Sequence, residues 1–312
     1  MRSSSTTRRH VLEGALAGWA SRAWPAVSSG SEVAITIDDL DVNPDDTPRF
    51  TLAQRNTVVL EVLRRHRLRV ALFVCGMRVD SEEGRRHLHE WDEEGHLIGN
   101  HTYSHVPYST TTFERFSADV LRGEEVLEGV RGYHKLFRFP ALKEGATREQ
   151  RDRMREFLRD HGYRMGYVTI DTSDWAVDAR LRKRLRADAQ ADIAPYRSFL
   201  LEHIWQRATF YDDLARRVLG RPVRHTLLIH HNLTTALFLE DLLKMFATRG
   251  WRVIDASSAF RDPVFQREPD IVPAGESLIW ALARETRRYD ALLRYPGEDS
   301  VYEDPRMDEL RL

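Results

Sequence analysis

The sequence has a single cysteine, Cys75, among its 312 residues. One thiol excludes an internal disulfide, a thiolate zinc cluster and CxxC redox chemistry, so a bound metal would have to use imidazole and carboxylate ligands. Net charge is also nearly absent, because 47 Lys and Arg stand against 48 Asp and Glu, and we therefore expect no nucleic acid partner. No stretch reaches the roughly 18 uncharged apolar residues of a membrane helix, so we expect no membrane span. The oligomeric state stays open.

The two ends of the chain differ from its middle. Arg8-Arg9 precede a weakly apolar run from Val11 to Ala20, which resembles a twin-arginine export leader. We expect residues 1–30 to be such a leader, with the protein in the periplasm or at the cell surface. The alternative is a disordered tail on a cytoplasmic protein. Residues 263–312 are predicted to be a C-terminal extension, with one amphipathic helix at 277–288 packed on the main domain.

The region 31–262 alternates short apolar runs with longer amphipathic ones, which is typical of parallel strands covered by helices. Seven strand-helix units favour a (β/α) barrel, and an open doubly wound sheet is the alternative. Residues 177–224, with helical pattern on both sides of Pro195, are predicted to be an insertion. Strands are predicted at 33–37, 70–74, 97–99, 136–139, 165–170, 226–229 and 252–254, and helices at 52–66, 81–94, 112–129, 148–161 and 237–248.

Polar side chains follow the carboxyl ends of these predicted strands, and in a parallel barrel those ends share one face. Taken singly, each has an ordinary structural explanation, such as a turn after a strand for an Asp pair. Taken together, two imidazoles and a carboxylate make a metal site that leaves positions open for water and substrate. The residues are Asp39, His101 and His105, with Asp38 beside them pointing elsewhere and available as a base.

Five motifs occur in a fixed order along the chain. They are Thr36-Ile37-Asp38-Asp39, the segment from Gly95 to His105, Arg138-Phe139-Pro140, Asp171-Thr172-Ser173-Asp174-Trp175, and Leu228-Ile229-His230. In order and spelling they resemble the polysaccharide deacetylase (NodB-homology) family, carbohydrate esterase family 4. The resemblance implies a distorted (β/α)₇ TIM-like barrel. It also implies a metal-dependent hydrolase that removes acetyl groups from N-acetylated or O-acetylated carbohydrate by base-activated water attack.

The resemblance also implies a role for each motif residue. A divalent ion, zinc first and Co²⁺, Ni²⁺ or Mn²⁺ as alternatives, would be held by Asp39, His101 and His105. Asp38 would be the general base. Three residues would support the reaction: Arg138 by pairing with Asp38, His230 as general acid, and Asp174 by raising the pKa of His230. The acetyl pocket would be formed by Ala141, through its backbone N–H, and by Trp175 and Leu228.

Some positions depart from the family pattern. Leu40 stands where the family has Gly, and Ala141 replaces a Tyr that would contact the sugar. The substrate therefore stays open among chitooligosaccharide, peptidoglycan and xylan ester. His231 follows His230, and we expect His230 to face the site and His231 to point away. One alternative function is an amidohydrolase that acts on a small cyclic or linear amide at the same barrel site. Another is a non-catalytic carbohydrate-binding relative.

Overall fold

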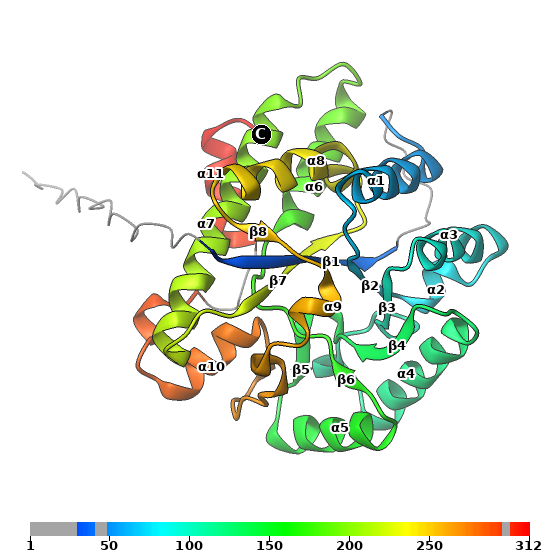
Figure 1. Cartoon of the computed structure of the whole chain (residues 1–312), viewed down its shortest axis with the longest axis vertical. Coiled ribbons are helices and arrows are strands. Elements are labelled where there is room, and N and C mark those ends of the chain that lie inside the picture. The colour runs from blue at the N-terminus through cyan, green and yellow to red at the C-terminus, as the bar shows by residue number, and fades with distance from the viewer. Residues whose placement is uncertain (1–29, 41–48, 295–299) are drawn as a thin grey trace, which may run out of the picture.

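The computed structural model describes residues 30–40, 49–294 and 300–312, and its centre is a parallel sheet (Figure 1). The strands follow the order β6-β4-β3-β2-β1-β7, and β8 pairs with the start of β1. A separate two-stranded sheet, β5-β9, is antiparallel. The strands are β1 Glu32–Asp39, β2 Ala71–Val74, β3 Leu97–Asn100, β4 Tyr133–Phe137, β5 Lys143–Gly145, β6 Arg164–Met165, β7 Arg224–His230, β8 Arg252–Val253 and β9 Ala274–Gly275.

The parallel sheet curls toward closure between its two ends. An isolated parallel bridge joins Ile170, in the segment after β6, to Leu227 in β7. Leu228 N donates to Ile170 O at 3.1 Å and so extends this contact. The predicted α/β barrel is confirmed, and the open doubly wound alternative does not apply. The predicted strand 165–170 is divided, because only its first and last residues pair with neighbours.

Helices surround the sheet, and most of them begin at a Ser, Thr or Asn whose side chain accepts a backbone N–H. Figure 1 shows α1, α6, α7 and α8 on the side of β1 and β7, and α4 and α5 beyond β4 and β6. The helices are α1 Leu52–His66, α2 Gly76–Val79, α3 Glu82–Glu93, α4 Phe113–Leu127, α5 Arg148–Asp160, α6 Asp174–Ala187, α7 Ala194–Leu219, α8 Leu233–Thr248, α9 Ala256–Ala259, α10 Leu278–Thr286 and α11 Asp304–Glu309.

Pro195 lies where a helix tolerates proline. The sequence predicts helical pattern on both sides of it, and the break between α6 and α7 falls at residues 188–193, just before this proline. Pro195 therefore sits in the first turn of α7, where the backbone N–H that proline lacks would have no partner within the helix.

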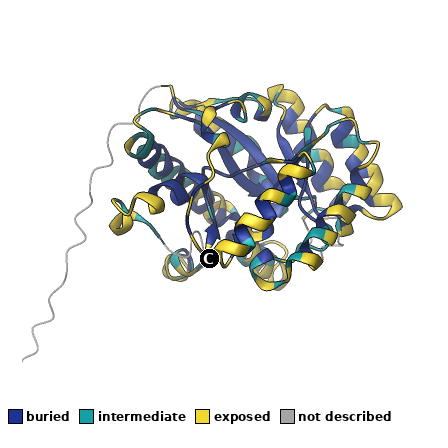
Figure 2. Ribbon diagram, turned by 90° about the horizontal axis from the view of Figure 1, so that it is seen from below, coloured by how far each residue is buried: buried dark blue, intermediate teal, exposed yellow. Residues whose placement is uncertain are grey.

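The core lies between the sheet and its helices, as the dark strands and the yellow outer helix faces of Figure 2 show. Inside the barrel, the fully buried ring of Phe73 lies beneath the guanidinium of Arg138, whose Cζ is 3.9 Å from the ring centroid. A side chain on Gly166 would begin 2.3 Å from this ring, so glycine is required there. Phe73 thus fills the interior and supports the carboxyl-terminal face of the barrel.

The C-terminal segment packs on the barrel by two elements. Helix α10 contacts α7, and β9 pairs with β5. The helix predicted at 277–288 is thereby found at Leu278–Thr286, with Ser277 as its N-cap. The predicted leader lies outside the described residues apart from Gly30. Within the described ranges, none of the helices combines the length and apolarity required to cross a membrane.

Candidate active site

The two predicted ligand histidines lie on a tight loop after β3. The Asn100 side chain accepts the backbone N–H of Thr102 at 2.8 Å, and the Thr102 hydroxyl accepts that of His105 at 3.1 Å. Thr102 and His105 have φ angles of 64° and 60°, in the left-handed region that few non-glycine residues adopt. This loop brings the rings of His101 and His105 to a centroid distance of 4.9 Å. Their four-residue spacing thus works through a loop and not through a helix.

Asp39 completes a candidate metal centre. One ligand atom from each of Asp39, His101 and His105 can be chosen so that all three atoms lie within 4.8 Å of one another. The Nε2 atom of His105 is 3.4 Å from Asp39 Oδ1, a buried oxygen that lacks a hydrogen-bond donor in the described structure. The backbone of Asp39 has a φ of 89°, a strained value for a residue with a side chain. The donor set therefore fits a divalent ion such as zinc.

The protonation state of the histidines also fits this use. The Nδ1 of His101 lies 2.8 Å from the carbonyl oxygen of Arg138, to which it can donate, which leaves Nε2 unprotonated toward the site. Burial lowers the pKa of His101 and of His105 to about 4, so both rings are neutral near pH 7. Neutral imidazole is the form that binds a metal.

Asp38 lies beside this set and faces a different partner. Its Oδ1 is 2.5 Å from Arg138 Nη1, and both side chains are buried. The Nε of Arg138 donates to Gly166 O at 2.8 Å, which fixes the guanidinium. Burial raises the pKa of Asp38 above its ordinary value, and the charge of Arg138 opposes that rise. A buried carboxylate held by one arginine is suited to accept a proton.

His230 lies at the end of β7, as the neighbour of Asp38 in the sheet register. Its Nδ1 is 2.8 Å from Asp174 Oδ1, and its backbone N–H donates to Asp174 Oδ2 at 2.9 Å. Asn232 donates from Nδ2 to the same carboxylate at 2.9 Å. Burial alone would lower the pKa of His230, but Asp174 outweighs it and raises this pKa to about 10. His230 is therefore an imidazolium near pH 7 and a potential proton donor.

These groups share one cleft of about 260 Å³ at the carboxyl ends of the strands. The register explains this, because Asp38 lies opposite Phe73 of β2 on one side and His230 of β7 on the other. Arg138 and Asp174 lie behind their partners rather than on the cleft surface, and Asp39 is held beside it by its contact with His105. The predicted residues that line the cleft are Asp38, His101, His105, Ala141, Trp175, Leu228 and His230.

The neighbouring His231 does point away from this cleft, as expected. It is buried and makes an edge contact with Trp91 at a centroid distance of 6.1 Å. Trp175, by contrast, is 45% exposed, so it forms an open wall. A second cavity, of about 330 Å³, lies beside α7 and α11 and contains none of the predicted site residues.

Sequence reasoning missed part of the cleft wall. Lys143 and Glu276 both line it and form an ion pair with each other. Lys143 is three residues after the third motif, and this proximity could have suggested it. Glu276 lies in the C-terminal segment, far from every motif, and no pattern in the sequence places it at the site. Asn232 lies just after the fifth motif and was not among the predicted site residues, yet it caps α8 and also donates to Asp174.

The protein belongs to the class of parallel barrels that carry a candidate metal centre. Its two histidines and one carboxylate lie at the carboxyl ends of the strands. Within this class, the family model of polysaccharide deacetylase matches residues 27–166, which run from before β1 to just past β6. This match confirms, for that segment, the polysaccharide deacetylase family that the motifs indicate. The fourth and fifth motifs lie beyond it, and the role of every predicted site residue, inside or outside the matched segment, stays a prediction.

Individual relatives match over a similar part of the chain. A peptidoglycan-N-acetylglucosamine deacetylase of Bacillus cereus is 26% identical over 147 residues, which are 46% of this chain and 46% of that protein. The peptidoglycan-N-acetylmuramic acid deacetylase PdaA of Bacillus subtilis is 27% identical over 135 residues, 42% of this chain and 47% of that protein. The chain thus spans just under half the length of these curated relatives.

Solved structures extend the likeness of fold further along the chain. The crystal structure of the polysaccharide deacetylase Bc1974 from Bacillus cereus aligns with a TM-score of 0.52 at 17% sequence identity. The alignment covers 72% of this chain and 91% of the other. At this identity the comparison supports the barrel fold alone, in agreement with the described strand order.

Proposed function

We propose that the protein is a metal-dependent deacetylase that hydrolyses the N-acetyl group of an amino sugar in a saccharide. The observation that carries this proposal is the convergence of three unlike groups in one cleft. A ligand set of Asp39, His101 and His105 lies next to a buried carboxylate at Asp38, and His230, an imidazolium, is the neighbour of Asp38 in the sheet register. Amide hydrolysis needs a base for water, stabilisation of the oxyanion and an acid for the leaving amine.

The metal would supply electrostatic stabilisation of developing negative charge when it is bound, and zinc is the ion that this ligand set favours. Asp38, ionised and oriented by Arg138, would remove a proton from the attacking water. His230 would donate its proton to the departing amine, and Asp174 would hold the ring in position. Trp175 and Leu228 would enclose the acetyl methyl, with the backbone N–H of Ala141 toward the oxygen.

The choice of substrate rests on two supports. The curated relatives carry names that specify N-acetylglucosamine and N-acetylmuramic acid of peptidoglycan, so N-acetylated amino sugars come first. The open wall formed by Trp175, with 45% of its surface exposed, gives a sugar ring an apolar face to contact. We further propose that residues 31–262 form the deacetylase unit and that residues 263–312 extend it.

Released acetate is the direct test of this function. Zinc-loaded protein, the same protein after chelation, and the Asp38→Asn variant would each be offered N-acetylglucosamine oligomers, peptidoglycan fragments, acetyl-xylan and small amides. We expect acetate from the N-acetylated saccharides with loaded wild-type protein only. Turnover of small amides without turnover of saccharides would favour the amidohydrolase alternative, and saccharide binding with no turnover at all would favour a binding protein.

Export would follow from a cell-wall substrate, and we propose that Arg8-Arg9 begin a twin-arginine leader. Fractionation of cells that express the full chain tests this. We expect protein outside the cytoplasm, and the Arg8→Lys/Arg9→Lys variant should be retained inside. Equal retention of both proteins would support the cytoplasmic alternative.

A further inference from the structure

Among the described residues that line the cleft, Glu276 is the one from the C-terminal segment. It lies more than 100 residues beyond the segment that the family model matches, yet it lines the same cavity as Asp38, His101 and His230. Its side chain is 10% exposed and pairs with Lys143, which also lines the cleft and is 31% exposed. A carboxylate and an ammonium group therefore stand side by side on one cleft wall.

The short sheet β5-β9 sets this position. Gly275 pairs with Lys143 in antiparallel register, and Glu276 N donates to Leu142 O at 3.0 Å. A side chain on Gly275 would begin 1.9 Å from the same carbonyl oxygen, so the chains approach this closely only because the residue is glycine. Beyond it, the Ser277 hydroxyl donates to Thr169 O at 2.9 Å and anchors the segment to the barrel.

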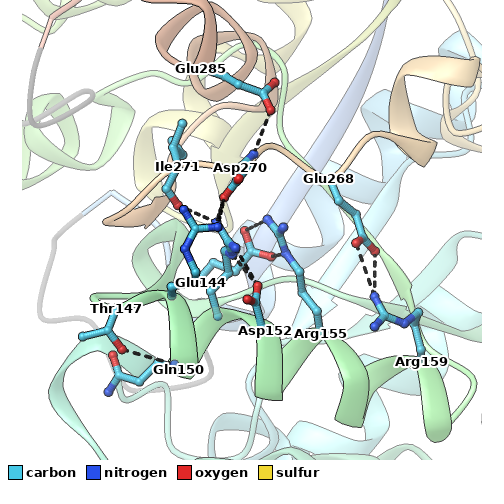
Figure 3. Close-up of polar contacts among 12 residues, drawn as sticks. Glu144, Thr147, Gln150, Asp152, Arg155, Arg159, Glu268, Asp270, Ile271 and Glu285 are labelled. Carbon is cyan, nitrogen blue, oxygen red and sulfur yellow. Dashed lines mark hydrogen bonds and ion pairs between the residues drawn. The ribbon is translucent and has the colours of Figure 1, made fainter.

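Helix α5 holds both sides of this small sheet through arginines spaced along one face (Figure 3). Arg155 forms a buried two-bond pair with Glu144 of β5, at 2.6 and 3.0 Å. Arg151 reaches the C-terminal segment, with Nη1 2.7 Å from Asp270 Oδ1 and 3.1 Å from the carbonyl oxygen of Ile271. The segment that carries Glu276 is thus fixed to the same helix as the strand that carries Lys143.

Backbone strain is concentrated where these elements meet. Glu276 has a φ of 67°, and Ala141 and Leu142 opposite have values of 50° and 54°. Residues with side chains rarely adopt this conformation, and it is retained chiefly where the surroundings enforce it, often at binding sites. Ala141 also lines the cleft. The ion pair therefore stands close to the residue whose backbone N–H is proposed to face the acetyl oxygen.

We propose that Glu276 and Lys143 bind hydroxyl groups of the saccharide and thereby determine substrate specificity. This inference rests on the proposed deacetylase function and identifies the substrate-contacting part of the site. A sugar hydroxyl both donates and accepts, and a carboxylate adjacent to an ammonium group offers one acceptor and one donor to a pair of neighbouring hydroxyls. A small amide without hydroxyl groups would gain nothing from the pair.

Binding and turnover of two substrates test the proposal. Calorimetry with tetra-N-acetylchitotetraose gives Kd when both proteins compared also carry Asp38→Asn to prevent turnover, and acetate release by the zinc-loaded proteins without that change gives kcat and KM. The small ester 4-nitrophenyl acetate serves as a substrate without sugar hydroxyls. For Glu276→Gln we expect Kd and KM for the tetrasaccharide to rise about tenfold, the effect of weakening one charged hydrogen bond. We expect kcat within about twofold and no change for the ester.

The reversed pair, Lys143→Glu/Glu276→Lys, separates contact with substrate from a structural role. If the pair only held β9 on β5, the reversed pair would restore wild-type values. We expect no restoration, because donor and acceptor have exchanged places. Glu268→Gln is the matched control. Glu268 also lies in the C-terminal segment and pairs with Arg159 of α5, but it is outside the cleft.

Several outcomes would overturn the proposal. They are an unchanged Kd in Glu276→Gln, an equal loss for tetrasaccharide and ester, restoration by the reversed pair, or no tetrasaccharide binding by the wild type. A wild type that binds the tetrasaccharide without releasing acetate, while Glu276→Gln weakens that binding, would instead refute the deacetylase function and support the role of Glu276.

Discussion

Asp38 and Arg138 lie 100 positions apart in the sequence, and their side chains meet at 2.5 Å inside the barrel. Phe73 lies under the guanidinium, and Gly166 accepts a hydrogen bond from it. This arrangement leaves the second carboxylate oxygen of Asp38 toward His101, whose Nε2 is 3.5 Å away. The carboxylate is thus held by an arginine on one side and lies against the candidate metal centre on the other.

Replacement of Asp38 by Asn keeps the shape of the side chain and removes its basicity. We expect kcat for saccharide deacetylation to fall about 10²- to 10⁴-fold, which is the usual contribution of a general base. Bound zinc, measured by elemental analysis, should stay near the wild-type content because Asp38 is outside the ligand set. Wild-type turnover by this variant would remove Asp38 from the mechanism.

His101→Ala is expected to lose both metal and activity, since it deletes one of three ligands. Zinc content after dialysis and acetate release check this directly. His89→Ala is the matched control, because His89 is an exposed histidine on α3 and should leave both quantities unchanged. Full zinc content in His101→Ala would contradict the assigned ligand set.

Asp174→Asn is expected to move the alkaline limb of the pH–rate profile. Asp174 raises the pKa of His230 to about 10, so the ring stays protonated far above neutrality. Without that carboxylate the pKa falls, and the proton-donating form disappears at lower pH. The profile of kcat/KM from pH 5 to 10 should therefore decline earlier in the variant. Coincident alkaline limbs would show that His230 is not the acid.

Buried neutral histidines make the fold sensitive to acid. Burial lowers the pKa of His96 to about 4 and that of His231 to about 3, below the ordinary 6.5. At a pH between the folded-state pKa and 6.5, the unfolded chain binds more protons than the folded one. The free energy of unfolding therefore has its full value above pH 6.5 and falls as the pH drops from about 6.5 toward 4. Urea unfolding at several pH values measures this. His231→Leu should flatten the dependence, and an unchanged slope would contradict the prediction.

Arg155 and Glu144 form a buried ion pair between α5 and β5. Arg155→Met leaves the carboxylate buried and unpaired, and we expect a loss of about 3–5 kcal/mol in the free energy of unfolding. Arg155→Met/Glu144→Leu removes both charges and should recover much of that loss. Thermal and urea unfolding of the two variants provide the measurement. A double variant as unstable as the single one would show that side-chain packing, not charge, dominates this site.

The sequence predicts the central barrel well because its strands are buried on both faces and appear as short apolar runs. The polar residues at the ends of β1, β3 and β7 can therefore be assigned to one face from the sequence alone. Prediction failed where pairing is brief. The strand expected at 165–170 pairs only at its ends, and β5 and β9 have three and two residues, too few for a periodic pattern.

The same limit explains the missed part of the cleft. Lys143 and Glu276 meet through tertiary hydrogen bonds between segments more than 130 residues apart, and neither belongs to a recognisable motif. Asp174 and His230 were paired in advance through a family pattern. A residue outside such a pattern becomes visible only when the fold places it, and Glu276 is of this kind.

The close approach at Gly275 limits which members of such a lineage can share this architecture. Any side chain at this position would clash with the carbonyl oxygen of Leu142. A homologue with another residue here could not keep its C-terminal segment paired with the strand that follows the third motif. Among homologues, we therefore expect a glycine at the position of Gly275 and an acidic residue at that of Glu276 to be present together or absent together, whether or not the five motifs are intact.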